Sequence, residues 1–242
     1  MVNAPTRLKD AIKRVPGVQT LYFRLSGMRL PRSTEAAFRE IVSENKWGVN
    51  ESLSGGGSDL HQTRIVRERL PALWAELSVT TVLDIPCGDF FWMKHVPKDG
   101  IHYLGADILP ELIESNNKLY RQSDVNFQTL NLLEGGLPKV DFILCRDCLM
   151  HFSYRHAITA LRNICESGST YLLTTTFTDR RRNHDIATGQ FRPLNLQARP
   201  IALPPPMLLI NEGCTEYEGA YPDKSLGLWR TADIRAHLER RH

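Results

Sequence analysis

Two acidic residues follow neighbouring predicted strands at a spacing typical of nucleotide sites. The stretch VLDIPCGDFFW (residues 82–92) predicts a buried strand that reaches Asp84 and then a turn with one glycine, Gly88. Dinucleotide-binding turns need the pattern G-x-G-x-x-G, so this turn disfavours nicotinamide and flavin cofactors. Asp107, 23 positions after Asp84, ends the next predicted strand, where a carboxylate can accept two hydrogen bonds from a ribose diol. A ribose ligand without a pyrophosphate favours an adenosyl compound, and S-adenosylmethionine (SAM) fits.

The segment CRDCLMHF (residues 145–152) contains groups suited to acid–base chemistry. His151, with an ordinary pKa near 6.5, can take the proton of an acceptor hydroxyl at neutral pH while a methyl group is transferred. Asp147 could orient the imidazole or bind a divalent cation that lowers the pKa of the hydroxyl. The alternative is a histidine that only packs at the start of a helix. Cys145 and Cys148 form a single C-x-x-C, so we expect buried thiols rather than a zinc or redox site.

These residues require a framework that brings them to one edge, and the sequence predicts an α/β fold. Strands are expected at residues 80–85, 101–107, 125–132, 139–147 and 169–177, with helices at residues 110–120 and 153–168 between some of them. Strands joined through helices of this length form a parallel sheet buried on both faces. The ligand of such a sheet lies beyond the carboxyl ends of the strands. The loops after Ile85, Ala106, Leu130 and Cys145 should therefore share one rim.

Over residues 78–177 the chain resembles the class I SAM-dependent methyltransferases. Their first loop reads roughly D/E-x-G-x-G-x-G, and Asp84, Pro86, Gly88 and Phe90 fall on its key positions, with only the middle glycine kept. The resemblance implies a Rossmann-like sheet of seven strands with the last one antiparallel, helices on both faces and an N-terminal helical extension. The segments MLLINE (207–212) and SLGLWR (225–230) would complete that sheet.

The same resemblance implies a set of cofactor contacts. Asp84 and the backbone of the Pro86–Gly88 turn would face the methionine part of SAM, and Asp107 would hold the ribose. SGGGS (54–58) could close over the cofactor through Ser58 and its neighbours, or could be a plain linker. The full predicted set is Asp84, Pro86, Cys87, Gly88, Asp107, Ile108 against the adenine, Asn131 and Leu132 at the adenine edge, Arg146 beside the sulfonium, and Ser58.

A narrower similarity concerns the acceptor. SGGGS, PCGDFFW, CRDCLMHFS, TTTF and RPLNLQARP are together similar to small bacterial sugar O-methyltransferases, with those of methylmannose polysaccharide synthesis as the closest match suggested. The similarity implies a carbohydrate acceptor, with a mannoside-like oligosaccharide favoured. Some such enzymes use Mg²⁺, for which Asp147 and Asp179 are conceivable ligands, and the sequence commits to neither.

About twenty-five residues after the predicted strand 169–177 show little periodicity, which is typical of a functional loop. This acceptor loop (178–200) contains Asp185, Arg192 and Asn195, which supply the donors and acceptors that a polyhydroxyl substrate needs. It also contains three consecutive arginines, at 180–182. They could meet RNA phosphates, although a solvated loop is the simpler interpretation.

Composition limits the remaining possibilities. The 242-residue chain has a formal net charge of +3 and five cysteines, and it shows neither a secretory signal nor a span of about 20 apolar residues. We therefore expect a cytoplasmic protein with reduced thiols and consider nucleic acid an improbable partner. Residues 1–58 form a predicted arm and residues 59–242 the methyltransferase domain. The basic stretch 1–32 could pack on a second subunit or touch an anionic surface. A non-catalytic SAM-binding module is the alternative to an enzyme.

Overall fold

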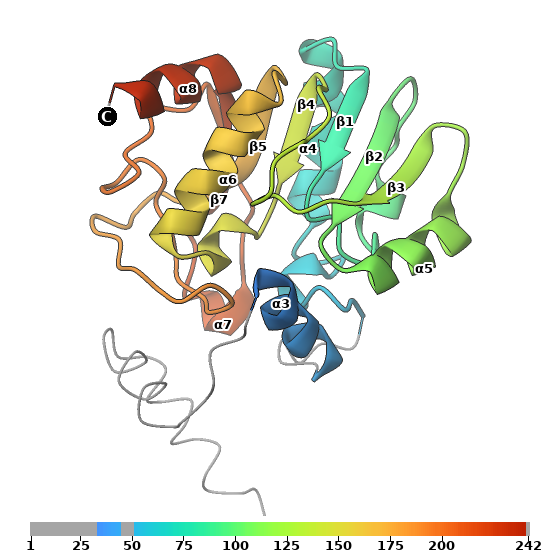
Figure 1. The fold of residues 1–242 in the computed structure, drawn as a ribbon, viewed down its shortest axis with the longest axis horizontal. Helices are drawn as coiled ribbons and strands as arrows, with labels where there is room; N and C mark the ends of the chain where they lie inside the picture. The colour runs from blue at the N-terminus through green and yellow to red at the C-terminus, as the bar shows by residue number, and fades with distance from the viewer. Residues whose placement is uncertain (1–32, 45–50, 241–242) are drawn as a thin grey trace, which may run out of the picture.

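A computed structural model describes residues 33–44 and 51–240. The predicted basic stretch 1–32, and with it the proposed contact to a second subunit, lies outside the described residues. A seven-stranded sheet with the order β3-β2-β1-β4-β5-β7-β6 forms the centre of the molecule (Figure 1). Its strands are β1 Thr81–Asp84, β2 His102–Asp107, β3 Val125–Thr129, β4 Phe142–Cys145, β5 Tyr171–Phe177, β6 Leu208–Asn211 and β7 Lys224–Arg230.

The direction of the strands confirms the predicted Rossmann-like sheet. Strands β1 to β5 pair in parallel, whereas β7 runs antiparallel to both β5 and β6. The helices are α3 Thr34–Ser43, α4 Arg64–Glu76, α5 Pro110–Tyr120, α6 Tyr154–Glu166, α7 Glu216–Gly219 and α8 Thr231–Glu239. None of the helices in the described ranges has the length and apolar character needed to cross a membrane.

Helices cover both faces of the sheet because its central strands are apolar on both sides. In β4, Phe142 and Leu144 belong to the core beneath α4, whereas Ile143 and Cys145 belong to the core beneath α6 and α8. All four side chains are fully buried. Figure 1 shows α6 and α8 in front of the strands and α4 behind them.

Two segments differ from what their sequence favours: the stretch 90–96 favours a helix, and Pro71 favours an interruption of the helix expected over residues 60–77. The stretch after β1 forms only a 3-10 turn, Met93–His95, because Pro97 follows within two residues and the connection to β2 is too short for a full helix. Pro71 does not interrupt its helix, since α4 runs continuously through it. The turn before α4 instead uses Asp59, whose carboxylate accepts the backbone N–H of Gln62 at 2.6 Å.

Helix α3 lies across the rim formed by the carboxyl ends of β1, β2 and β4 (Figure 1). Its Ser33 cap accepts the N–H of Ala36, and Arg39 holds Glu111 at the start of α5 with two hydrogen bonds, of 2.9 and 3.2 Å. On its other side, Phe38 meets Phe152 edge to face. The helix therefore spans the rim from α5 to the turn after β4.

Candidate functional site

A cavity opens at the carboxyl ends of β1, β2 and β4. All ten residues predicted to contact the cofactor line it, and so does Asp147. Thr34, Phe38 and Val42 of α3 form part of its wall. A second, more open cavity lies at the opposite edge of the sheet, between Gly168–Thr170 and α8, and contains none of the predicted residues. The fold therefore brings the residues predicted from the sequence together around one cavity, and cofactor binding there stays a prediction.

Two buried carboxylates define one side of this cavity. Asp107 accepts the N–H groups of Gly88 and Leu109 at 3.2 and 3.1 Å, and Asp84 accepts the hydroxyl of Tyr103 at 2.6 Å. Burial raises the pKa of Asp84 to about 7 and that of Asp107 to about 6. A ligand that brings hydroxyl or ammonium donors would favour the ionised form of both groups.

The retained glycine of the turn is required by its backbone. Gly88 has φ 55°, in the left-handed region that only glycine adopts without strain. A Cβ atom at this position would lie 2.0 Å from Oγ of Ser54. Asn116 donates to the Gly88 carbonyl at 2.7 Å and fixes the turn from α5. Although a proline and a cysteine precede Gly88 in this turn, the glycine determines the path of its backbone.

The glycine-rich segment, residues 52–58, is docked on this turn. The Asp89 carboxylate accepts the hydroxyl of Ser52 at 2.9 Å and the N–H of Leu53 at 2.7 Å. Ser54 and Ser58 line the cavity. These contacts argue against a plain linker and support the predicted closure over the cofactor site.

A cluster of charged side chains lies at the other side of the cavity. Arg146 donates to Glu212 at 2.6 and 3.0 Å and to the carbonyl of Gly57 at 2.8 Å, while Lys224 contacts Asp147 at 2.8 Å. Arg146, Glu212 and Lys224 are all at most 5% exposed. The guanidinium of Arg146 is therefore held by this network while the residue also lines the cavity, and its place beside the sulfonium stays a prediction.

Asp147 is paired with both cations of this cluster. Burial alone would raise its pKa, but Arg146 and Lys224 hold the pKa at about 2. One carboxylate oxygen contacts both cations and the other accepts the Thr175 hydroxyl at 3.2 Å. Two cations and a hydroxyl therefore contact this carboxylate, while its charge still raises the pKa of His151. A role of Asp147 in orienting the imidazole stays a prediction.

The same contacts bear on magnesium. One oxygen of Asp147 already faces two cations and the other accepts a hydroxyl, while the carboxylate of Asp179 accepts the hydroxyl of Thr178 at 3.3 Å. Among the residues that the structure describes, no three His, Cys, Asp or Glu side chains are grouped as metal ligands. The use of Mg²⁺ stays a prediction that these contacts do not favour. Cys145 and Cys148 are buried free thiols.

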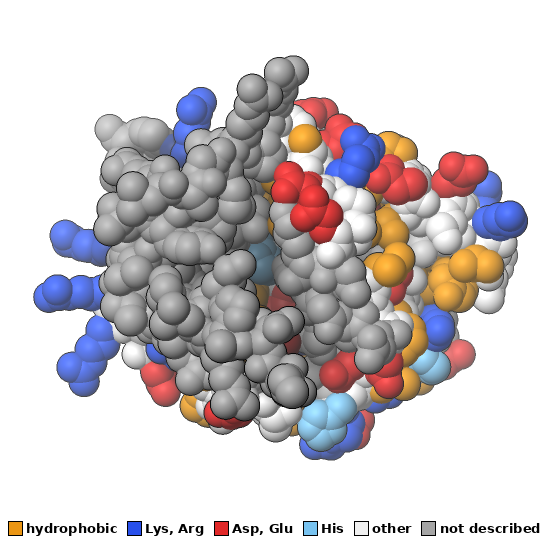
Figure 2. Space-filling model, turned by 90° about the horizontal axis from the view of Figure 1, so that it is seen from below, with side chains coloured by type: hydrophobic (Ala, Val, Ile, Leu, Met, Phe, Trp, Pro, Cys, Tyr) orange, Lys and Arg blue, Asp and Glu red, His pale blue; other side chains and the backbone are white. Residues whose placement is uncertain are grey.

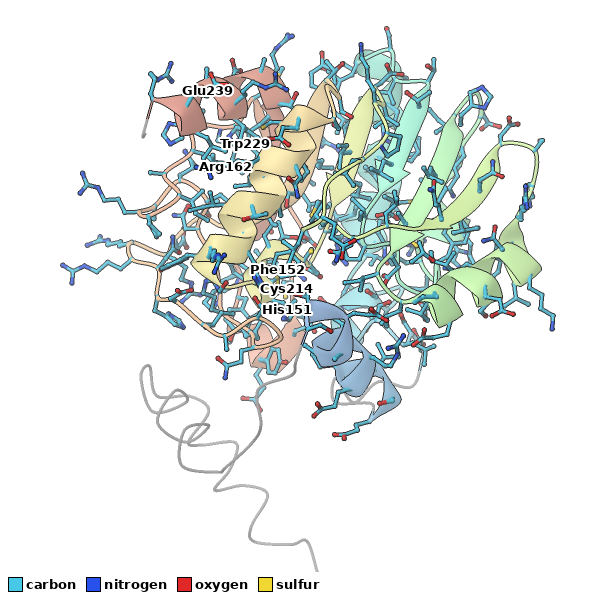
Figure 3. The ribbon with its side chains drawn as sticks, in the orientation of Figure 1. His151, Phe152, Arg162, Cys214, Trp229 and Glu239 are labelled. Atoms are coloured by element: carbon cyan, nitrogen blue, oxygen red, sulfur yellow. The ribbon has the colours of Figure 1, made fainter. Side chains whose placement is uncertain are left out.

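His151 lies in a 3-10 turn, Leu149–His151. Its chain neighbours Cys148 and Phe152 line the cavity, and Figure 3 shows His151 close to Phe152. Its Nδ1 is 3.0 Å from the carbonyl oxygen of Gln190. A carbonyl only accepts, so Nδ1 carries the proton and Nε2 is the basic nitrogen of the neutral ring. Burial lowers the pKa of His151, which keeps the ring neutral at physiological pH.

The three residues predicted to contact the acceptor differ in exposure and in their hydrogen-bond partners. Asp185 is exposed, and its carboxylate accepts the N–H of Tyr154 at the start of α6 at 2.8 Å. Asn195 is buried and donates to the carbonyls of Thr178 and Arg180, so it shapes the acceptor loop and is not available to a substrate. Arg192 is fully buried beside the His151 turn.

Sequence reasoning missed Glu212 and Lys224. Glu212 follows β6 at the same rim, and an acidic residue at the end of a predicted strand is the signal that identified Asp84 and Asp107. Lys224 opens β7, whose antiparallel direction places the start of the strand at this rim. Helix α3 was missed as a wall of the cavity because its apolar residues carry no chemical signature.

Comparisons with known proteins agree with this geometry. Residues 83–173 match the family model described as a methyltransferase domain. No curated protein matches the chain. Among solved structures, N-methyltransferase NodS from Bradyrhizobium japonicum WM9, in complex with S-adenosyl-L-homocysteine, is 15% identical with a TM-score of 0.57, over 80% of this chain and 97% of that one.

Human N-acetylserotonin methyltransferase in complex with SAM is 13% identical with a TM-score of 0.50, over 81% of this chain and 67% of that one. The chain spans 59% of the length of magnesium protoporphyrin IX methyltransferase from Synechocystis PCC 6803, to which it is 16% identical with a TM-score of 0.38. The likeness to NodS and the human enzyme shows the class I methyltransferase fold.

Proposed function

We propose that this protein is a SAM-dependent O-methyltransferase that methylates a hydroxyl of a small carbohydrate, with His151 as the general base. The methyltransferase-domain match and the fold support SAM as the methyl donor. The observation that carries the finer proposal is the state of His151. Its ring is neutral, has its Nδ1–H bound to Gln190 and lies beside the cavity that collects the predicted cofactor residues.

The cavity suits the parts of SAM in order. Asp107 would accept the ribose hydroxyls, and Asp84 with the Pro86–Gly88 turn would face the methionine part. At the opposite side, the cluster holds the carboxylates of Asp147 and Glu212 against Arg146 and Lys224. Paired charges of both signs add little net positive charge, so a cationic sulfonium can approach.

The proposed chemistry needs one proton acceptor and in-line positioning. Bound SAM would supply an electrophilic methyl group. The acceptor oxygen forms a bond to that methyl carbon while the carbon–sulfur bond breaks and its electron pair stays on sulfur. Nε2 of His151 takes the hydroxyl proton as the attack proceeds.

Aromatic side chains favour a carbohydrate acceptor. The ring of Phe191 lies 5.9 Å from His151, and Tyr221 lies 5.4 Å from Phe191. Tyr217, 5.7 Å from Tyr221, is 72% exposed. Phe191 and Tyr221 pack against each other and the core, so the exposed ring of Tyr217 is the one that would offer an apolar face to the C–H face of a sugar.

Little supports a polynucleotide acceptor. Of the three consecutive arginines, Arg180 pairs with Asp223 at 3.2 Å. Figure 2, which looks onto the rim from below, shows acidic and basic side chains interspersed over the right of the view. Mixed charge of this kind does not produce the one-sign field that binds a phosphate backbone.

The first test is calorimetry with SAM, S-adenosylhomocysteine and NADH. We expect the first two to bind and NADH not to bind, and absence of SAM binding would overturn the proposal. Transfer of labelled methyl from SAM to monosaccharides and mannosides then follows, at low and high salt. Steep loss of transfer with salt would indicate a polyanion instead.

The general base is tested with His151→Ala against His184→Ala, an exposed histidine of the acceptor loop. We expect His151→Ala to bind SAM normally and lose about 10²- to 10⁴-fold in kcat, and His184→Ala to retain most of it. Unchanged turnover of His151→Ala would refute the assignment.

A further inference from the structure

Arg192 has a buried positive charge with no carboxylate in hydrogen-bond contact among the described residues; burial lowers its pKa, and the nearby charge of Asp185 opposes that shift only in part. The Arg192 side chain is 0% exposed. Nη1 donates to the carbonyl of Phe152, whereas Nε and Nη2 are buried and have no hydrogen-bond partner within the part of the chain that the structure describes. A buried guanidinium normally has a carboxylate or a set of acceptors around it, because an uncompensated charge is costly to bury.

The two free donors are on the same edge of the guanidinium. Nε and Nη2 point in one direction and match the two oxygens of a carboxylate. The protein uses this edge elsewhere: Arg39 presents Nε and Nη2 to the two oxygens of Glu111 at 2.9 and 3.2 Å, and Arg146 presents them to one oxygen of Glu212 at 3.0 and 2.6 Å. Arg192 has the same edge available and no side chain of the described ranges on it.

This edge is held next to the proposed base. Residues 189–192 run along the His151 turn: Gly189 donates to the carbonyl of His151 at 2.8 Å, and Arg192 donates through its backbone to Met150 at 3.2 Å. Gln190 accepts from the His151 ring, and the Arg192 side chain reaches Phe152. The guanidinium thus lies against the turn that carries the base, and it stacks 4.9 Å above the ring of Tyr154.

We propose that the Nε–Nη2 edge of Arg192 binds a carboxylate of the acceptor, so that the substrate is a hydroxyl-bearing carboxylic acid such as a uronic acid. This inference rests on the proposed function, since it identifies the acceptor of the same reaction. The substrate carboxylate would supply the acceptors for Nε and Nη2 that no described side chain provides. The bidentate contact would fix the distance between the acidic end of the substrate and His151.

The electrostatics agree with an anionic ligand. Burial lowers the pKa of His151; the hydrogen bond to Gln190 and the charge of Asp147 oppose this, whereas the charges of Lys224 and Arg192 act in the same direction as burial. Burial and Arg192 also lower the pKa of His184. A bound carboxylate would offset the field of Arg192 and make Nε2 of His151 a stronger base in the complex than in the free enzyme.

Access to the edge requires movement of the acceptor loop, because Nε and Nη2 are enclosed. Movement of this loop meets little steric resistance, because residues 181–191 are all partly or fully exposed. Gly189 within this stretch, with φ 98°, has the backbone freedom of glycine. Acceptor binding is therefore expected to shift this stretch.

The test compares D-glucuronate with D-glucuronamide, its neutral analogue, and with D-glucose 6-phosphate. Binding to the full-length protein saturated with S-adenosylhomocysteine is measured by NMR, with wild type, Arg192→Met and Arg182→Gln. Arg182 is an exposed arginine of the same loop and serves as the matched control. The pKa of His151, read from its ring C–H signals, is followed with and without glucuronate.

We expect wild type and Arg182→Gln to bind glucuronate about ten- to a hundredfold more tightly than glucuronamide, with a rise in the pKa of His151. Arg192→Met should lose that preference without losing its fold, because removal of an uncompensated buried charge is well tolerated. Undetectable glucuronate binding, equal binding of both probes, preference for the phosphate, or a preference that persists in Arg192→Met would each overturn the inference.

Methyl transfer from labelled SAM to the same probes separates the two proposals. Equal methylation of glucuronamide and glucuronate would refute the Arg192 site and leave the methyltransferase assignment intact. Arginine-dependent binding of glucuronate by a protein that neither binds SAM nor methylates any acceptor would refute the proposed function instead.

Discussion

Replacement of Gly88 with alanine should release the glycine-rich segment from the cofactor turn. Two costs add at this position. Alanine at φ 55° costs about 1 kcal/mol more than glycine. The new Cβ would also lie 2.0 Å from Oγ and 3.1 Å from Cβ of Ser54, so Ser54 must move.

Movement of Ser54 pulls its neighbours from Asp89, which accepts one hydrogen bond from Ser52 and one from Leu53. Each is worth about 1–2 kcal/mol after allowance for partial exposure. The docking free energy of the segment should therefore fall by about 3–5 kcal/mol in total. Because Ser54 and Ser58 line the cavity, SAM affinity should fall with it.

Ser54→Gly removes the atoms that clash, so the double variant Gly88→Ala/Ser54→Gly should retain only the backbone cost. The assay is urea denaturation and SAM calorimetry on wild type, both single variants and the double variant. Gly100→Ala is the matched control, because Gly100 also has a positive φ, 73°, but a Cβ there meets nothing within 4 Å. A double variant that is additive within about 0.5 kcal/mol would refute the steric account.

Three further outcomes follow from buried polar groups. Burial raises the pKa of Asp84 from its ordinary value of 3.8 to about 7 in the folded protein. The folded state therefore binds a proton more tightly than the unfolded state, and wild type loses stability as the pH rises from about 4 to 7. Relative to wild type, the free energy of unfolding of Asp84→Asn should rise by up to about 4 kcal/mol between pH 4 and pH 8, as measured by denaturation at both values. Glu212→Leu should cost about 3–5 kcal/mol, since it leaves the buried cations Arg146 and Lys224 with Asp147 as the one carboxylate of the described residues in contact with both. Arg146→Met should restore much of this stability, and a Glu212→Leu protein as stable as wild type would contradict the network. Asn195→Ala leaves two carbonyls of the acceptor loop without a donor and should lower the free energy of unfolding by about 1–3 kcal/mol. An unchanged thermal midpoint together with a raised KM would instead identify Asn195 as a substrate contact.

The sheet and the position of the site were predictable because both follow from local signals. Buried parallel strands read as apolar runs, and the acids that end them, Asp84 and Asp107, necessarily meet at one rim. The paired strands β1 and β2 place these two carboxylates beside the same turn. Acidic residues at the ends of predicted strands can therefore be recognised in a single sequence.

The partners of the polar side chains were not predictable, because they depend on contacts between distant segments. Asp147 was expected to orient His151, and its contact with Lys224, 77 residues away, was not foreseen. Gln190, whose carbonyl accepts from His151, carries no catalytic signature. Asn195 looked like a substrate contact and turned inward, since the carbonyls of a long loop also need donors.

Gly189 contacts both the turn that carries the proposed base and helix α3. Its N–H is bound to the backbone of the proposed base, and its missing side chain makes room for Ala37 of α3, whose Cβ would be 3.3 Å from a Cβ at position 189. The same helix closes the cofactor cavity through Phe38. A displacement of α3 on release of the proposed cofactor would therefore also loosen the packing of the loop that holds the His151 turn. Hydrogen exchange at the Gly189 amide would register that loosening, slow in the nucleoside-bound protein and fast without it.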